Sequence, residues 1–220
     1  ANNTSIEYVE DAMEIISDDL PEGLSVSLSV EGTEGNVLTG NLSGEYDVAT
    51  YRISGDLTIA EGNTAYLHAG TEFLFDGQYN FTIKGTLKAI GSESDSIIFD
   101  NIGESRWKGF ILDGASDETE FQYVRISGAE SFTGGNTTDS FGGGMLLISS
   151  HPTLTHVTIT ENIAKYGGGM SLYTSNPTLT NVTIANNIAE YRGGGMYLWY
   201  SHPTLTYMTI TKNIAEKYGG

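Results

Sequence analysis

The fold of this chain is decided by a stretch that occurs three times. It reads GGGMLLISSHPTLT over residues 142–155, GGGMSLYTSNPTLT over residues 167–180 and GGGMYLWYSHPTLT over residues 193–206. The three starts lie 25 and 26 residues apart, and the same residue types recur at the same offsets, as at Met145, Met170 and Met196. A period in the twenties with apolar residues at fixed offsets is typical of a solenoid, in which each repeat buries its apolar face by stacking on its neighbour.

The repeats are predicted to form β-strands rather than helices. Each is rich in Thr, Val and Ile, as around Leu154, Val157 and Ile159, and β-branched residues favour strands. Pro152 and the glycine triplets do not suit the interior of a helix. The sequence also lacks the L-x-x-L-x-L-x-x-N pattern of leucine-rich repeats and the G-G-x-G-x-D pattern of calcium-binding β-rolls. A parallel β-helix remains, with coils stacked about 4.8 Å apart.

Stacked coils assign a role to each kind of residue. The apolar positions of one repeat are expected to point inward and to form ladders with their copies in neighbouring repeats; they are Met145, Leu147, Leu154, Val157, Ile159 and Ile163. Asn162, Asn187 and Asn213 are expected at a turn, where stacked side-chain amides can bond coil to coil and satisfy backbone groups. The glycine triplets are expected to form a tight corner with positive φ.

The same pattern extends toward the N-terminus with less regularity. Residues 121–127 (FQYVRIS) match residues 154–160, and residues 107–112 (WKGFIL) match the strand that follows each glycine triplet. We therefore predict an acidic N-terminal segment over residues 1–50 and a β-helix over residues 51–220. Within the β-helix, residues 51–141 form irregular coils, with a polar loop from Glu130 to Gly142, and residues 142–220 form the regular repeats. About seven coils are expected from Tyr51 on.

Several stretches together carry a resemblance to a known family. They are GDLTIAEG, HAGTEFLF, KGTLKAIGSESDSIIFD, the W-x-G-F-x-L strand and the repeated NPTLTNVTI. Over about residues 51–220 the chain resembles secreted bacterial and archaeal right-handed parallel β-helix proteins of the pectate-lyase-like superfamily. This resemblance implies an all-β, right-handed, single-stranded parallel β-helix. It implies no single function, because that superfamily contains lyases, hydrolases, adhesins and passive cell-surface repeats.

The first 50 residues differ in kind from the rest. Thr4 or Ser5 can cap a helix, and apolar residues then recur on one helical face at Ile6, Val9, Met13, Ile16 and Leu20. This pattern predicts an α-helix over about residues 5–19, and residues 24–30 (LSVSLSV) alternate as a strand does. A helix laid across the open end of a β-helix would cover its unpaired backbone and apolar core, so we expect a cap. The alternative is a helix that docks a partner.

The charge of the chain limits its partners. The 220 residues carry a formal net charge of −18, and residues 1–50 hold eleven acidic and no basic residues, whereas residues 142–220 have a net charge of +1. Because no basic stripe exists, nucleic acid is excluded as a partner. No run of 18 apolar residues occurs, so no membrane span is expected. The acidic surface indicates a solvated face, or else cation binding or repulsion of anionic polymers.

The two ends of the sequence suggest a location and a mode of assembly. The chain begins at Ala1 without Met or a charged-plus-apolar leader, which fits an exported protein whose signal peptide has been removed. We therefore expect an extracellular or cell-surface protein. The chain stops at Gly220, where another strand would begin. Either a longer repeat array continues, or order stops there, or a second copy stacks end to end to build a filament.

Catalytic chemistry has little support in the sequence. The regular repeats contain no Asp, and their three Glu are isolated, whereas a glycosidase needs two carboxylates about 5–9.5 Å apart. Asp113, Asp117 and Glu118 are a weak Ca²⁺ candidate, with a solvated acidic turn as the alternative. His151 and His202 share the repeat position of Asn176, which indicates a turn residue rather than a metal ligand. We assign no catalytic residue and no cofactor other than this Ca²⁺.

Aromatic and hydroxyl side chains gather on the regular repeats. The strands after the glycine triplets are expected to expose Tyr173, Tyr197 and Trp199, followed by Tyr200, and a tyrosine recurs just before each triplet, at Tyr166, Tyr191 and Tyr218. Flat aromatic side chains stack on sugars and also form protein interfaces. Two parallel outward rows of threonine are also predicted: Thr153, Thr178 and Thr204, and Thr155, Thr180 and Thr206.

These patterns predict a non-catalytic extracellular scaffold or adhesion module. It would present an aromatic and Thr-rich face to polysaccharide or to copies of a surface protein, with Tyr173, Tyr197, Trp199 and Tyr200 as the contact residues. One alternative is a polysaccharide lyase or hydrolase with its site near the Glu130–Gly142 loop. Another is a filament subunit that self-associates end to end. Threonine rows also resemble those of ice-binding β-solenoids, but Thr suits any exposed strand and three coils make a small patch, so ice binding is disfavoured.

Overall fold

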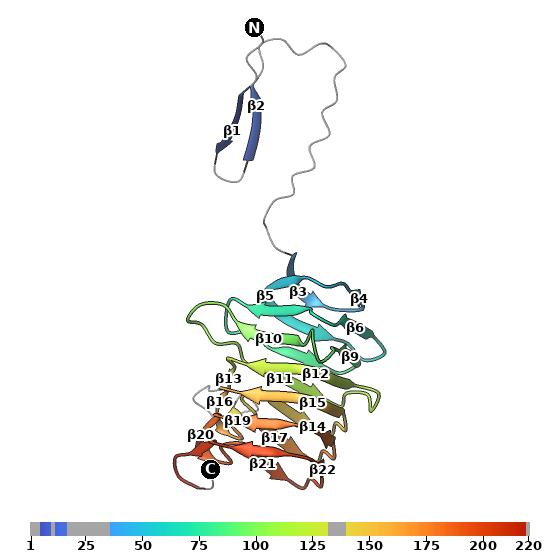
Figure 1. Ribbon diagram of the computed structural model, residues 1–220, viewed down its shortest axis with the longest axis vertical. Coiled ribbons are helices and arrows are strands. Elements are labelled where there is room, and N and C mark those ends of the chain that lie inside the picture. The colour runs from blue at the N-terminus through green and yellow to red at the C-terminus, as the bar shows by residue number, and fades with distance from the viewer. Residues whose placement is uncertain (1–4, 10–11, 17–35, 132–139, 219–220) are drawn as a thin grey trace. The chain divides into compact units, whose positions relative to one another are not determined.

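The computed structural model describes residues 5–9, 12–16, 36–131 and 140–218 of the chain (Figure 1). It divides the chain into two compact units, residues 1–33 and residues 34–220, and each is described by itself. The described part of the chain contains no helix with the length and hydropathy needed to cross a bilayer.

The first unit contains a pair of antiparallel strands. Strand β1 (Ser5–Val9) pairs with β2 (Ala12–Ile16), so that Ile6 lies opposite Ile15 and Tyr8 opposite Met13. The α-helix predicted over about residues 5–19 is therefore wrong for both described segments. The apolar spacing fits a helix, but these segments are rich in Ile, Val and Tyr, which favour extended backbone when a partner strand is available. The strand predicted over residues 24–30 lies outside the described residues.

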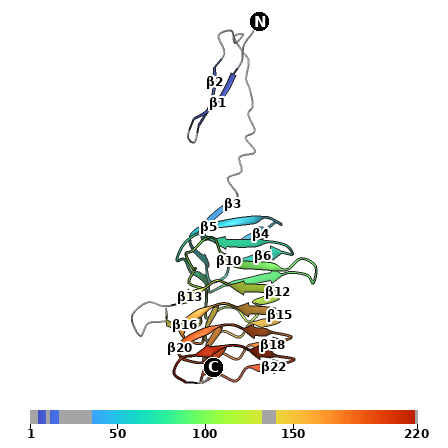
Figure 2. The same cartoon turned by 60° about the vertical axis from the view of Figure 1, so that its left-hand side comes forward.

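The second unit is a parallel β-solenoid, and its coils lie one above another in both views (Figures 1 and 2). Among the described residues its strands form one 18-stranded sheet and one 4-stranded sheet. The strands of the irregular coils are β3 (Asn36–Asn41), β4 (Gly44–Tyr46), β5 (Thr50–Ile59), β6 (Thr64–His68), β7 (Glu72–Phe75), β8 (Phe81–Ile83), β9 (Thr86–Ile90), β10 (Ile97–Asn101), β11 (Phe110–Asp113), β12 (Glu120–Ser127) and β13 (Glu130–Ser131).

The regular repeats continue the same arrangement. Their strands are β14 (Met145–Ile148), β15 (Thr153–Thr160), β16 (Ile163–Tyr166), β17 (Met170–Tyr173), β18 (Thr178–Thr180), β19 (Thr183–Ala185), β20 (Ile188–Arg192), β21 (Met196–Trp199), β22 (Thr204–Thr206), β23 (Thr209–Thr211) and β24 (Ile214–Ala215). The solenoid begins earlier than predicted, because β3 and β4 pair in parallel with β5 and β6. Residues 36–50 thus belong to the solenoid and not to a separate N-terminal segment.

Inward-facing residues form ladders that run through the whole stack. One ladder follows the parallel register from β5 to β23 through Tyr51, Phe73, Phe99, Ile126, Ile159, Ile184 and Ile210. Its seven rungs agree with the seven coils expected from Tyr51 on. A second ladder passes through Leu57, Phe81, Phe110, Met145, Met170 and Met196. The predicted column of methionines is therefore confirmed.

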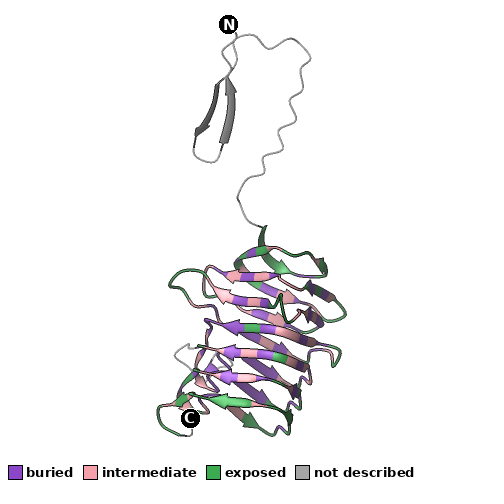
Figure 3. Cartoon of the chain, in the orientation of Figure 1, coloured by how far each residue is buried: buried purple, intermediate pink, exposed green. Residues whose placement is uncertain are grey.

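The core changes in character along the axis. In the irregular coils it is aromatic: the rings of Phe73 and Phe99 stack with centroids 5.3 Å apart, and those of Phe75 and Trp107 with centroids 4.3 Å apart. Trp107 is fully buried, and its indole N–H donates to the Ser127 carbonyl oxygen at 2.7 Å. In the regular repeats the core is aliphatic. Figure 3 shows that the middle coils bury most residues, whereas the strands of the last coil are largely exposed.

The predicted asparagine ladder is confirmed, and Asn162 and Asn187 are fully buried in it. The Asn187 Oδ1 accepts from the Asn162 backbone N–H at 3.0 Å and from the Asn162 side-chain amide at 3.1 Å. Asn187 repeats both bonds to the Oδ1 of Asn213, each at 3.0 Å. Each amide nitrogen also donates to a backbone carbonyl of the preceding coil, as Asn187 does to Ile159 at 2.9 Å. These bonds satisfy buried polar groups at a turn and tie coil to coil.

A second polar ladder was not predicted from the sequence. The Ser175 Oγ accepts from the Ser150 backbone N–H at 3.1 Å, and the Ser201 Oγ accepts from the Ser175 N–H at 3.0 Å. Each hydroxyl in turn donates to the carbonyl oxygen two residues before it, as Ser175 does to Tyr173 at 2.9 Å. The serines therefore satisfy a second corner in the same way as the asparagines.

The glycine triplets form the predicted tight corner. The first glycine of each triplet has a φ near +65°: 63° at Gly142, 65° at Gly167 and 65° at Gly193. The second glycine is needed for a different reason, because a Cβ on Gly143 would collide with the carbonyl oxygen of Gly168 in the next coil. The triplet thus combines a left-handed turn with close approach of successive backbones.

Candidate functional site

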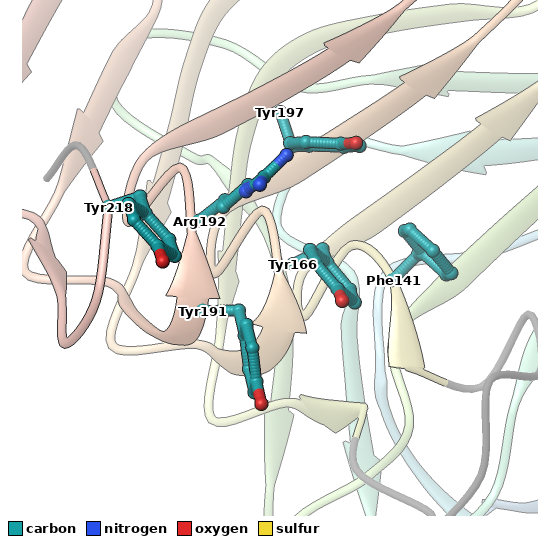
Figure 4. Close-up of a pocket in the computed structure, with 6 residues that line it drawn as sticks. All are labelled: Phe141, Tyr166, Tyr191, Arg192, Tyr197 and Tyr218. Atoms are coloured by element: carbon teal, nitrogen blue, oxygen red, sulfur yellow. The ribbon is translucent and has the colours of Figure 1, made fainter.

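An aromatic groove lies where the β13–β16–β20–β24 sheet turns into the strands that follow the glycine triplets. Six residues line it: Phe141, Tyr166, Tyr191, Arg192, Tyr197 and Tyr218 (Figure 4). Its volume is about 450 Å³, within the ~300–1,000 Å³ typical of ligand sites. The lining residues come from β16, β20 and β21 and from the segments that precede the glycine triplets. The groove therefore spans several successive coils.

The rings of the groove support one another. Phe141 and Tyr166 stack with centroids 4.9 Å apart and an interplanar angle of 16°. Tyr197 leans over both, with its centroid 6.1 Å from that of Phe141 and 5.5 Å from that of Tyr166. Tyr191 continues the row, 5.7 Å from Tyr166. Ring pairs at such separations attract one another, so the walls of the groove are held in place before any ligand arrives.

Three cationic side chains lie against these rings. The Lys217 Nζ is 3.6 Å from the centroid of the Tyr191 ring, and the Lys165 Nζ is 5.3 Å from the same centroid. The Arg192 guanidinium lies 5.1 Å from the centroid of Tyr218, and in Figure 4 the arginine extends from beside Tyr218 toward Tyr197. The pKa of Lys217 is raised, chiefly by its side-chain hydrogen bond with Tyr191. The raised pKa keeps the Lys217 ammonium group charged at neutral pH.

Arg192 lies where the segment from Ile188 to Gly193 is one residue longer than the segment from Ile163 to Gly167. Ala164 pairs with Ala189, but Tyr166 pairs with Arg192, so the register shifts by one residue between these pairs. The sequences show the same insertion, because Ile163 is followed by AKYGGG and Ile188 by AEYRGGG. The extra residue between Ile188 and Gly193 accounts for the lengthening of the repeat from 25 to 26 residues. Such bulges redirect a side chain locally and are over-represented beside functional sites.

The charge around the groove contrasts with that of the chain. Lys217 lies 3.8 Å from the Glu190 carboxylate. Within residues 36–131 and 140–218, no carboxylate oxygen lies within the 4.0 Å ion-pair distance of Arg192 or Lys165. In a chain of net charge −18, these two cations stand without an acidic partner among the described groups. Arg192 is also exposed, so its guanidinium is accessible to a ligand.

The predicted contact residues fall into two adjoining groups. Tyr197 lines the groove, whereas Tyr173 and Trp199 lie opposite each other in the register of β17 and β21. Trp199 contacts Tyr200 edge to face, with centroids 5.4 Å apart. The exposed fractions are 49% for Tyr173, 43% for Trp199 and 77% for Tyr200, so this second group is open to solvent. Because Tyr197 and Trp199 lie two residues apart on β21, they share its outer face.

The threonine rows are aligned as predicted. Thr153, Thr178 and Thr204 pair in one row, and Thr155, Thr180 and Thr206 pair in the other. The leucine between the two threonines is fully buried in β15 and β18, at Leu154 and Leu179, and becomes exposed in β22, at Leu205. The threonines are half-buried in β15 and become exposed by β22. These rows lie on a different strand column from the aromatic groove.

Asp113 and the histidine candidates have structural partners. The Asp113 carboxylate lies 3.3 Å from the Lys84 Nζ, and the structure does not bring Asp117 and Glu118 together with it as a set. In the described residues no group of three or more His, Asp or Glu side chains is arranged to hold a metal ion. The His151 Nδ1 accepts from the Asn176 N–H at 2.9 Å, and the Asn176 Oδ1 accepts from the His202 N–H at 2.7 Å. These residues link turns, as expected.

The comparisons with known proteins leave the groove as the main indication of function. No protein-family model, curated protein or solved structure matches the chain. Sequence reasoning named Tyr197 as a contact residue but missed Phe141 and Arg192. The recurrence of tyrosine before each glycine triplet was a signal for the groove, and the one-residue difference between repeats was a signal for Arg192.

Proposed function

We propose that this protein is a non-catalytic extracellular β-solenoid that binds polysaccharide in its aromatic groove. It would act as a scaffold or adhesion module at a cell surface, with Tyr197 and the neighbouring Trp199 as the central contact residues. Membership of the pectate-lyase-like superfamily, which the sequence resembles, is part of this proposal and is consistent with a parallel β-solenoid. No metal or cofactor is needed for binding of this kind.

The observation that carries the proposal is an open groove with five aromatic side chains on a rigid stack. Sugars present flat apolar faces together with hydroxyl groups, and aromatic side chains with polar tips complement both. Four of the five rings are tyrosines, whose hydroxyl groups add donors and acceptors at the rim. The exposed rings of Trp199 and Tyr200 extend the surface along and beyond β21. Isolated aromatic residues are common on surfaces, but a contiguous group of this size is typical of a binding site.

Affinity electrophoresis in gels that contain neutral and acidic polysaccharides tests the proposal. We expect at least one polysaccharide to retard the wild-type protein. Tyr197→Ala and Trp199→Ala should each weaken binding about two- to twelvefold, since an aromatic contact contributes about 0.5–1.5 kcal/mol beyond its buried area. Tyr66→Ala is the matched control, because Tyr66 is an exposed strand tyrosine in β6, far along the chain from the groove.

The electrophoresis tests binding, and a separate assay tests turnover. If no polysaccharide retards the wild-type protein, or if both variants behave as Tyr66→Ala does, the proposal is wrong. Incubation with uronate polymers, followed by absorbance of newly formed unsaturated ends, would reveal the lyase activity that remains the alternative prediction. The proposal expects no such signal.

A further inference from the structure

The bulge in β20 gives the groove a chemical preference that its aromatic rings alone do not explain. In the preceding repeat the tyrosine at Tyr166 leads directly into Gly167, whereas Arg192 separates Tyr191 from Gly193. Because Ala189 pairs with Ala164 and Arg192 pairs with Tyr166, the added residue lies between Ala189 and Arg192, at the groove itself. The stacking continues past the bulge, because Ala189 pairs with Ala164 on one side and with Ala215 on the other. Arg192 is exposed beside this bulge, so its side chain is presented at the surface of the groove.

We infer that the groove recognises a sugar residue that carries one acidic group, a carboxylate or a sulfate ester, and that Arg192 binds this group. The inference rests on the proposed function and specifies its ligand. The guanidinium presents donors in a planar fork that matches carboxylate and sulfate oxygens, and it is the cation suited to such bidentate contacts. Lys165 lies nearby against the Tyr191 ring and lacks a carboxylate partner among the described residues. Arg192 and Lys165 together provide a positive electrostatic potential at one point of the groove.

The charge of the solenoid limits the size of the ligand. Residues 36–141 hold 16 acidic and 6 basic residues, a net charge of −10, whereas residues 142–220 have a net charge of +1. A long polyanion would be repelled by most of this surface, because charges interact over about 8 Å at physiological ionic strength. A single acidic sugar in an otherwise neutral chain meets only the local cations. We therefore assign the groove to an isolated or terminal acidic residue rather than to a uniformly charged polymer.

Titration calorimetry with matched oligosaccharides tests the inference. The probes are an oligosaccharide with one uronate residue, its carboxyl-reduced neutral counterpart and the corresponding sulfate ester. We expect the wild-type protein to bind an acidic form about ten- to a hundredfold more tightly than the neutral form, the range expected for hydrogen bonds to a charged partner. Arg192→Gln should remove this preference, so that the acidic and neutral probes bind with equal affinity, and Arg192→Lys should restore the preference in part.

Two further variants make the result specific to the bulge. Deletion of Arg192 restores the Tyr-Gly-Gly-Gly junction of the preceding repeat, so the circular dichroism spectrum should be retained while the preference is lost. Lys212→Gln removes one positive charge from the next coil and should leave the preference intact. Equal binding of neutral and acidic probes by the wild-type protein, or a preference that survives in Arg192→Gln, would overturn the inference and leave the proposed function standing. Absence of binding to every probe would count against both.

Discussion

The asparagine ladder offers the sharpest test of how this solenoid is held together. Asn187→Ala removes a fully buried side chain that bonds to the coil before it and to the coil after it. The backbone N–H of Asn162 loses its acceptor at 3.0 Å, and the carbonyl oxygen of Ile159 loses its donor at 2.9 Å. The Asn213 Oδ1 keeps the Asn187 backbone N–H at 3.0 Å. Two buried backbone groups are thus left without these partners.

The expected loss of stability follows from these two groups. A buried donor or acceptor without a partner costs about 1–3 kcal/mol, so Asn187→Ala should lower the free energy of unfolding by about 2–6 kcal/mol. In a solenoid each coil contacts only its neighbours, so the loss should concentrate at the interfaces of the mutated coil. We therefore expect the C-terminal repeats to unfold before the irregular coils in the variant.

Urea denaturation followed by tryptophan fluorescence and circular dichroism measures both effects. Trp199 reports on the C-terminal repeats and Trp107 on the aromatic core of the irregular coils, so the variant should separate their transitions. Asn186→Gly is the matched control: Asn186 is the exposed neighbour of Asn187, and its φ of 56° is one that glycine adopts readily. A loss below about 1 kcal/mol for Asn187→Ala, or one equal to that of the control, would refute the assigned role of the ladder.

Two further predictions concern the core and the response to pH. Met170→Ala should lower the free energy of unfolding by about 2–5 kcal/mol in the same urea experiment, because Met170 is fully buried between Met145 and Met196. Met170→Leu should lower it by less than about 1.5 kcal/mol. Equal effects of the two substitutions would argue against a packed ladder. Burial raises the pKa of Tyr51 above its ordinary value of 10.0, and Asp47 adds to the shift. The folded state therefore holds the Tyr51 proton more tightly than the unfolded chain does. The stability that this proton contributes is lost as the pH rises above about 10. Tyr51→Phe should make the loss of thermal stability on the alkaline side shallower, and an unchanged slope would contradict this reasoning.

Much of the regular solenoid could be predicted because its contacts are repeats of one another. When Met145 recurs at Met170 and Met196, stacking places like on like, and no longer-range information is needed. The buried asparagine ladder follows from the same rule, since an amide at a fixed offset always meets its own copy. The serine ladder obeys it too, and it was missed because a serine in a polar stretch carries no apolar or amide signal.

The structure of the N-terminal segments and of the irregular coils depends on contacts between segments that are not copies of one another. Residues 5–16 have apolar spacing that suits either a helix or a strand, and the presence of a partner segment decided for strands. Residues 36–50 join the solenoid because β3 and β4 find parallel partners in β5 and β6. Asp113 forms an ion pair with Lys84 of an earlier coil, and no local sequence motif predicts this pair.

The sequence by itself determined the period of the repeat, the strand character of each unit and the inward ladders, because these are consequences of periodic apolar and β-branched residues. Only the tertiary structure decided that one extra residue would be accommodated as a bulge in β20, with Arg192 opposite Tyr166. It also decided that Phe141, Tyr191 and Tyr218 would line one groove with them. The physical reason is that an insertion changes the direction of side chains only through the register of the neighbouring strand, which exists once the coils have stacked.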